Sequence, residues 1–150
     1  MKTPKFLTIL SVAATFMLTS CGTTSPLYYW GLVTNDVSAY ENLTYRYFEE
    51  HSPESLCRLI SMYEGIVSSP GGMRNVPPPG VCAEYGYLLL KPESAEIFAE
   101  HANLVQKRRF RSDNYASLFP EIGKQMIEKE MQLYPESAKF LAPLLESLTK

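Results

Sequence analysis

Cysteine and histidine are the residue types in this sequence that are best suited to nucleophilic or metal chemistry. His51 and His101 stand alone, and the paired Cys/His spacing that binds zinc does not occur. Cys57 and Cys82 fall in apolar stretches with helical periodicity, where a thiol is usually inert. They could form a disulfide in an oxidising compartment or be two buried apolar side chains, and we favour the second interpretation. We expect no metal site and no cofactor.

Catalytic motifs are also missing, since the sequence has no G-x-S-x-G elbow and no glycine loop that could hold a phosphate. Glu128 and Glu130 would point to different faces of one helix, so they are poor candidates for an acid–base pair. We therefore expect a protein that is not an enzyme and has no small-molecule substrate. A hydrolase with an unrecognised site is the remote alternative.

Cys21 is the cysteine whose surroundings specify a reaction. It follows Leu18, Thr19 and Ser20. A bulky aliphatic residue three positions before a cysteine, with small residues between them, resembles the bacterial lipobox. A lipobox is cut before its cysteine, whose thiol carries diacylglycerol and whose new amino group is acylated, for example with palmitate. Two or more acyl chains hold a protein firmly at a membrane surface, and the alternative is an ordinary signal peptide with a chance cysteine.

The residues before Cys21 agree with lipidation. Lys2 and Lys5 give a positive start, and residues 6–17 form an apolar run that is too short to span a bilayer but suits a signal peptide. The sequence thus divides into a signal peptide at residues 1–20, a lipidated tether with an aromatic segment at residues 21–36, and a helical domain at residues 37–150.

Gly22 bears on the choice of membrane. Bacterial lipoproteins that are retained at the inner membrane typically have Asp directly after the lipidated cysteine, where this sequence has Gly22. Residues 22–25 also lack the acidic run that exports some lipoproteins to the cell surface. We expect an outer-membrane anchor, on the periplasmic face rather than the cell surface. Cleavage would leave 12 basic and 16 acidic residues, and this acidic balance argues against nucleic acid as a partner.

Apolar residues recur with helical spacing in six stretches. Three of these follow the string Pro-Glu-Ser, at Pro53, Pro92 and Pro135, and proline followed by glutamate suits the start of a helix. The other three are residues 37–50, preceded by an Asn35/Asp36 cap, residues 80–90, where Ala83, Gly86 and Leu90 offer a small face for close packing, and residues 121–133. Residues 87–90 are the only candidate strand.

The copies of Pro-Glu-Ser are 39 and 43 residues apart. Periods near 40 are typical of helical-hairpin arrays. The expected fold class is therefore all-α, with about six helices paired as hairpins after the lipidated tether. Three separate capping signals would produce the same string, so a weak repeat and a coincidence both stay open.

Two segments are predicted to be loops. Residues 69–80 hold four prolines and three glycines and cannot be helical; a plain connector is favoured over a polyproline docking segment. Residues 107–120 contain the cations Lys107, Arg108, Arg109 and Arg111. These cations could bind anionic lipid or an acidic partner, or they could simply suit the C-terminal end of a helix, which we favour.

Tyr28, Tyr29 and Trp30 lie together shortly after Cys21. They are either the first core residues of the domain or an interfacial set that docks on membrane or partner. A predicted helix with an aromatic face begins just after them, which favours packing.

Several of these features together resemble one family. The strings PLYYWG at residues 26–31, PPG at 78–80 with Ala83 and Gly86, and EKEMQLYPES at 128–137, together with Tyr40, are similar to the bacterial lipoproteins of the domain-of-unknown-function family 4810. The similarity spans nearly all of residues 21–145. The family usually has Phe at the position of Tyr134 and His at that of Cys82, and residues 106–120 form a longer stretch than is typical.

The resemblance implies a compact, tetratricopeptide-like helical domain with no known activity. It also implies association, since such lipoproteins are often encoded beside a curli-secretion-channel-like lipoprotein and another small lipoprotein. We therefore expect an adaptor for other envelope lipoproteins. The candidate binding residues are Tyr28, Tyr29, Trp30, Lys107, Arg108, Arg109 and Arg111. The alternative is a lipoprotein that binds the cell wall or anionic lipid through its cations.

Overall fold

The computed structural model describes residues 25–150 of the chain, so the predicted signal peptide and Cys21 lie outside the described residues. Within this range the chain forms seven α-helices, one short 3-10 helix and one two-stranded hairpin. The prediction of a mostly helical domain is therefore confirmed. The one α-helix that was not predicted, at residues 104–107, is a single turn, and the apolar periodicity does not reveal it.

The described chain opens with a small hairpin that the sequence analysis misses. Strand β1 (Val33–Thr34) pairs antiparallel with strand β2 (Val37–Ser38). Asn35 and Asp36 between them have φ angles of 51° and 62°, the left-handed conformation that a two-residue hairpin turn requires. Helix α2 (Ala39–Glu50) therefore starts two residues later than predicted. The predicted Asn35/Asp36 cap is wrong, because both residues form the hairpin turn and Ser38 caps the helix instead.

Helix α3 (Pro53–Ser68) follows after a two-residue turn and packs on α2. Its start is the predicted one, with Pro53 in the first turn. Ser52 and Ser55 each accept a hydrogen bond from the other's backbone amide, at 3.1 Å, which completes a capping box. The first Pro-Glu-Ser is thus a helix start.

The second Pro-Glu-Ser has a different conformation. Helix α4 (Val81–Leu90) ends just before it, and helix α5 (Ser94–His101) begins only at its serine. The Ser94 hydroxyl is fully buried and donates a 2.6 Å hydrogen bond to the carbonyl of Leu88, so this serine closes the end of α4. The predicted helix after Pro92 is therefore shorter and later than the periodicity indicates.

Helix α6 (Leu104–Lys107) is the extra single turn. Ala102 is extended and ends α5, and Asn103 then forms a capping box with Gln106. Because a side-chain cap starts a new helix here, the periodic pattern that continues to Val105 does not belong to one helix.

Helix α7 (Tyr115–Leu133) begins six residues earlier than predicted and contains Pro120. The predicted loop at residues 107–120 is therefore wrong at its C-terminal end. Tyr115 is 4% exposed and Phe119 is fully buried. Burying these two aromatic side chains stabilises the first turns of α7 by more than the one hydrogen bond that proline removes there.

The third Pro-Glu-Ser forms a 3-10 turn, η1 (Pro135–Ser137), which leads into helix α8 (Ala138–Leu148). The first copy thus starts an α-helix, the second forms a turn between two α-helices, and the third forms a 3-10 turn. They do not share one conformation, so the string alone does not define a structural repeat.

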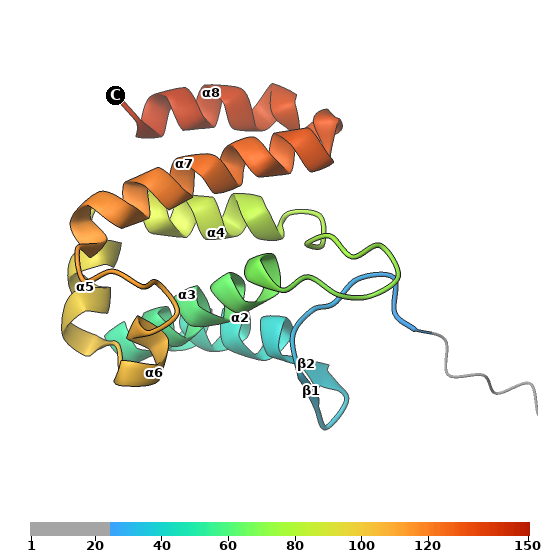
Figure 1. Ribbon diagram of the computed structural model, residues 1–150, viewed down its shortest axis with the longest axis horizontal. Coiled ribbons are helices and arrows are strands. Elements are labelled where there is room, and N and C mark those ends of the chain that lie inside the picture. The colour runs from blue at the N-terminus through green and yellow to red at the C-terminus, as the bar shows by residue number, and fades with distance from the viewer. Residues whose placement is uncertain (1–24) are drawn as a thin grey trace, which may run out of the picture.

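The helices stack in the order α8, α7, α4, α3 and α2, as Figure 1 shows, and α5 and α6 close one end of the stack. The hairpin β1–β2 and the point where the described chain begins lie at the other end. Helix α8 is outermost and has no buried residue.

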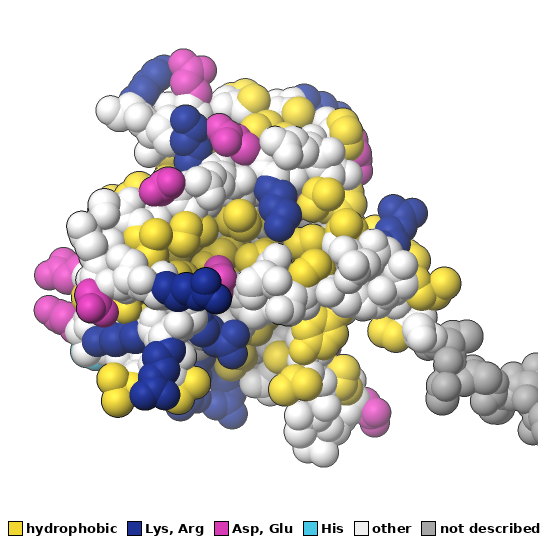
Figure 2. Space-filling view, viewed as in Figure 1, with side chains coloured by type: hydrophobic (Ala, Val, Ile, Leu, Met, Phe, Trp, Pro, Cys, Tyr) yellow, Lys and Arg dark blue, Asp and Glu magenta, His cyan; other side chains and the backbone are white. Residues whose placement is uncertain are grey.

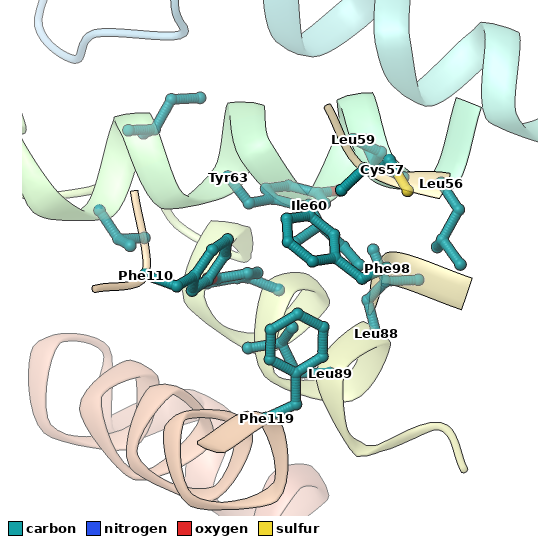
Figure 3. Close-up of a cluster of buried hydrophobic side chains, with 14 of the residues drawn as sticks. Leu56, Cys57, Leu59, Ile60, Tyr63, Leu88, Leu89, Phe98, Phe110 and Phe119 are labelled. Atoms are coloured by element: carbon teal, nitrogen blue, oxygen red, sulfur yellow. The ribbon is translucent and has the colours of Figure 1, made fainter. Parts of the chain in front are cut away.

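The core lies where α3, α4, α5 and α7 meet. Figure 3 shows side chains from these helices converging on Phe98 and Ile60, which are both fully buried. Phe98 is in edge-to-face contact with Phe110, Tyr115 and Phe119, with ring centroids 5.0, 5.1 and 5.3 Å apart. Such aromatic pairs contribute about 0.5–1.5 kcal/mol each beyond the area that they bury.

Helices α4 and α7 approach unusually closely at two glycines. A Cβ atom on Gly86 would lie 2.6 Å from the carbonyl oxygen of Gly123 and 2.7 Å from Cγ1 of Ile127. The predicted small face on residues 80–90 therefore packs against α7, and its Leu90 lies against Gly123. Residues 87–90, the candidate strand, lie within α4, so that assignment is wrong.

Candidate binding groove

An open groove of about 710 Å³ runs along α3. Its floor is formed by α3 residues, among them Arg58, Met62 and Ile66. Ile66 is buried and Met62 is half-buried, so the floor is largely apolar, while Arg58 is exposed. A concave apolar surface with a few charged groups is typical of binding sites.

One wall of the groove comes from the aromatic segment (residues 26–31) and the hairpin. Tyr29 and Leu32 line it together with Leu43 of α2. Gly31 makes this wall possible: its φ is 87°, and a Cβ atom there would lie 2.8 Å from Cβ of Ala39. Two backbone hydrogen bonds, from Ala39 to Leu32 and from Tyr40 to Trp30, fix the segment to the start of α2.

The other wall comes from the α6 region, where Gln106 and Arg109 line the groove. The Arg109 guanidinium lies against α3, and its Nη1 is 3.3 Å from the position that a Cβ atom on Gly65 would take. Neither Arg58 nor Arg109 forms a salt bridge with any described residue. The groove therefore combines an apolar floor with two arginines whose guanidinium groups can bind a carboxylate.

The aromatic segment is held in place by the proline loop (residues 69–80). The amides of Met73 and Arg74 donate hydrogen bonds of 3.0 and 3.1 Å to the carbonyls of Pro26 and Leu27. Gly72 has a φ of 76°, and a Cβ atom there would lie 2.8 Å from backbone atoms of this segment. The proline loop thus supports the aromatic segment, whereas from the sequence a plain connector is favoured.

The structure separates the three predicted aromatic residues. Tyr29 lines the groove, Tyr28 lies under the Arg74 guanidinium at 5.8 Å from its ring centroid, and Trp30 packs edge-to-face on Tyr40 at 4.9 Å. All three are half-buried, and Trp30 packs against the hydrophobic core. Trp30 thus packs on the core, whereas Tyr29 borders an open surface.

The predicted cations also separate. Lys107 donates a 2.6 Å hydrogen bond to the carbonyl of Ala99, in the last turn of α5, which is the helix-end role that we favour from the sequence. Arg109 lines the groove, while Arg108 and Arg111 are exposed outside it. Figure 2 shows Lys and Arg side chains gathered over the corner of the molecule around α6. Arg58 joins Arg109 in the groove, and this role of Arg58 is not evident from the sequence because it lies on a different helix.

Two carboxylates bind tyrosine hydroxyls across the helix stack. Glu84 accepts hydrogen bonds from Tyr40 at 2.9 Å and from Tyr63 at 2.7 Å, and Glu64 accepts one from Tyr85 at 2.8 Å. Burial and the neighbouring Glu84 raise the pKa of Tyr40 to about 12 and raise that of Tyr63 further. The hydroxyls therefore stay protonated near neutral pH and tie helices α2, α3 and α4 together.

Glu130 is a charged side chain that is only 2% exposed. Its Oε1 accepts a 2.6 Å hydrogen bond from the Gly80 amide at the start of α4, where no local side chain caps the helix. Burial raises the pKa of this carboxyl, and the backbone amides of the helix terminus oppose that rise. Glu130 on α7 thus caps α4 from a distance, a role that spacing along the sequence does not reveal.

Cys57 and Cys82 are both free and buried, at 1% and 0% exposure. Cys57 lies 3.8 Å from the carbonyl oxygen of Ile97. Burial raises the pKa of each thiol to about 11. The disulfide considered from the sequence is not formed in this structure, and the raised pKa values give both cysteines little thiolate character at neutral pH.

The described residues hold no group of three or more His, Cys, Asp or Glu side chains that could bind a metal ion. Within residues 25–150, no helix is long and apolar enough to cross a membrane. Comparisons with family models, with curated proteins and with solved structures found no match to this chain. The resemblance to the family described above therefore remains a prediction from its motifs.

Proposed function

We propose that the protein is a lipid-anchored adaptor on the periplasmic face of the outer membrane, and that it binds a segment of a partner protein in the groove on α3. The observation that supports this proposal is the meeting of Tyr29 and Arg109 in one groove. These residues come from two separate regions that the sequence marks as candidate binding sites, 80 positions apart. No catalytic role is assigned.

The lining of the groove specifies the chemistry of the partner segment. Met62, Ile66 and Leu43 favour apolar side chains, whereas Arg58 and Arg109 favour a carboxylate. An extended or helical peptide with apolar side chains and one or two acidic residues fits both requirements. Protein interfaces commonly place arginine and aromatic residues at the centre of the contact, where they contribute most of the binding energy.

The finer architecture and the partner belong to the same proposal. The hairpin of α2 and α3 and the contact of α7 with α8 support a tetratricopeptide-like arrangement, although α4 packs mainly on α7, which is not its neighbour in sequence. The family resemblance favours another envelope lipoprotein, such as a curli-secretion-channel-like one, as the partner.

Photocrosslinking in living cells tests the groove directly. A photoreactive amino acid replaces Leu32, which lines the groove and is 76% exposed, or Phe48, which is 75% exposed on α2 outside it. We expect a discrete crosslinked protein from position 32 and none from position 48. Charge reversal by Arg109→Glu should abolish the crosslink from position 32, because it places a carboxylate where the partner's acidic group binds.

Arg46→Glu is the matched control, since Arg46 is an exposed arginine on α2 that does not line the groove. It should leave the crosslink intact. The same faint, diffuse products from positions 32 and 48, or equal loss of the crosslink in both charge-reversal variants, would contradict a partner in the groove.

A second candidate function is binding of the cell wall or of anionic lipid by the corner around α6. Leu104 and Val105 are 72% and 67% exposed there, and Arg108 and Arg111 form no salt bridge with any described residue. This corner lies at the opposite end of the helix stack from the point where the described chain begins (Figure 1). A surface bound there would therefore lie away from the anchor, which favours cell wall over outer-membrane lipid.

Sedimentation with purified peptidoglycan tests the second candidate. If the corner binds cell wall, the protein should co-sediment at low salt and be released at high salt, because attraction between exposed charges is screened. The double variant Arg108→Ala and Arg111→Ala should then stay in solution. Co-sedimentation that is unchanged in the double variant would exclude the corner as the binding site.

A further inference from the structure

The end of the molecule where the described chain begins exposes apolar side chains. Leu27 is 50% exposed and Met73 is 73% exposed. Leu27 and Met73 come from segments that are joined by backbone hydrogen bonds of 3.0 and 3.1 Å, so they are held side by side. We call residues 25–31 and 69–80 together the apolar tip.

The apolar tip has no acidic residue, although the chain contains 16 in all. Its one charged side chain is Arg74, which is exposed and lies over the ring of Tyr28 at 5.8 Å. Tyrosine and arginine beside exposed aliphatic side chains are the composition that favours the boundary between lipid headgroups and acyl chains. A surface that binds an acidic protein partner would need more cations than this one.

The position of the tip along the chain agrees with this composition. Cys21, the predicted lipidation site, precedes Leu27 by six residues. Six extended residues span about 20 Å at most. If Cys21 is lipidated, the tip therefore cannot leave the neighbourhood of the membrane surface.

We propose that the apolar tip is a second membrane contact, in which Leu27 and Met73 enter the lipid interface while Arg74 lies among the headgroups. The anchor raises the effective concentration of lipid at the tip, so a contact too weak to bind membranes alone becomes occupied. The contact orients the helix stack, with α5 and α6 directed away from the membrane. The inference rests on lipidation of Cys21 and does not depend on a partner in the groove.

Depth-dependent fluorescence quenching in vesicles tests this contact. The lipidated full-length mature protein carries Met73→Cys or, as a control, Phe140→Cys, each labelled with an environment-sensitive fluorophore. Residue 140 is 69% exposed on α8. The native Cys57 and Cys82 are buried with raised pKa values, so the parent protein carried through the same labelling measures any background.

Intact mass confirms the acyl chains before reconstitution into vesicles of phosphatidylethanolamine and phosphatidylglycerol. We expect emission from position 73 to shift to the blue and to be quenched at least twofold by spin-labelled lipid, with little effect at position 140. Equal quenching of both positions by an aqueous quencher, with none by spin-labelled lipid, would overturn the proposal. Quenching at position 73 only after a protein partner is added would overturn it too, because the tip would then be a protein interface.

Discussion

Two interfaces in this molecule use the same device, a glycine that lets two backbones come together, yet they differ in what surrounds the glycine. Between α4 and α7, Gly86 faces Gly123 among buried side chains. Between the proline loop and the aromatic segment, Gly72 faces Pro26 and Leu27 at the surface. A Cβ atom would meet backbone atoms at 2.6 Å in the first interface and at 2.8 Å in the second.

The similar distances hide a difference in what can move. Helices α4 and α7 are packed on other helices and joined by the Glu130 cap, so they can separate only by opening the core. The aromatic segment is a short piece of chain outside the helices, so we expect that it can separate from the loop while the helix stack stays intact. The first interface therefore determines whether the domain folds, and the second determines where Tyr28 and Tyr29 are held.

The largest effect should come from Gly86→Ala. The added methyl group would lie 2.6 Å from the Gly123 carbonyl oxygen and 2.7 Å from Ile127, so α4 and α7 must move apart. Overpacking a tight core typically costs about 1–3 kcal/mol, and we expect the upper end or more because a backbone atom blocks relaxation. The melting temperature should fall by about 10 °C, measured by circular dichroism at 222 nm. An unchanged melting temperature would show that the two helices are not in this contact.

Gly72→Ala should have a smaller and local effect. The left-handed φ costs a residue with a Cβ atom about 1–2 kcal/mol, and the contact with Pro26 and Leu27 adds strain. Because the aromatic segment can separate from the loop and relieve this strain, the total loss of stability should stay at about 1–2 kcal/mol. Hydrogen exchange is the sharper measurement: the amides of Met73 and Arg74, which donate to this segment, should lose protection. Equal loss of protection in α4 and α7 would mean that the two interfaces are not independent.

The same contrast explains how much the sequence could predict. The helices rest on local patterns, so the helical class, the start of α3 at Pro53 and the small face with Gly86 follow from neighbouring residues. The hairpin turn at Asn35 and Asp36 could also have been predicted from the sequence. Two adjacent residues that tolerate left-handed conformations, placed between valines, favour a hairpin. The start of α7 could not have been predicted in this way, because it depends on burying Phe119 against residues from other helices.

The candidate groove shows the same limit. Tyr29 and Arg109 are recognisable from composition, since each belongs to a cluster of one residue type. Arg58 cannot be recognised in this way, because no neighbouring residue distinguishes it from other exposed arginines on an amphipathic helix. The carboxylates of Glu84 and Glu130 bind groups 44 and 50 positions away. Only the three-dimensional arrangement of the helices brings such pairs together.

The third prediction concerns pH and the cap that fixes the α4–α7 interface. Because burial raises the folded-state pKa of Glu130 above its ordinary value of 4.5, the folded protein holds this proton more tightly than the unfolded chain does. Its stabilising contribution is therefore complete below pH 4.5 and is lost as the pH rises through the folded pKa. Glu130→Gln mimics the protonated carboxyl. It should match the native protein at pH 4 and become the more stable of the two towards pH 8.

Thermal unfolding of both proteins across this pH range measures the difference. Glu128→Gln is the control, because it removes a similar charge from α7 at an ion pair with Lys124 and leaves the start of α4 untouched. A constant offset between native protein and Glu130→Gln at all pH values would contradict a raised pKa at Glu130.

The smallest effect should come from Gly65→Ala, and its sign should be opposite to that of Gly86→Ala and Gly72→Ala. Gly65 lies inside α3, and a Cβ atom there would meet only Arg109, at 3.3 Å from Nη1. That atom is the end of a flexible side chain, which can shift by a few tenths of an ångström. Alanine in place of glycine within a helix stabilises by up to about 1 kcal/mol, so the melting temperature should rise by a few degrees. Because Arg109 lines the groove, the same change should weaken crosslinking from position 32 while the fold becomes more stable. A loss of stability comparable to that of Gly86→Ala would instead mean that Arg109 is as firmly fixed as the backbone between α4 and α7, and that the groove wall is part of the core.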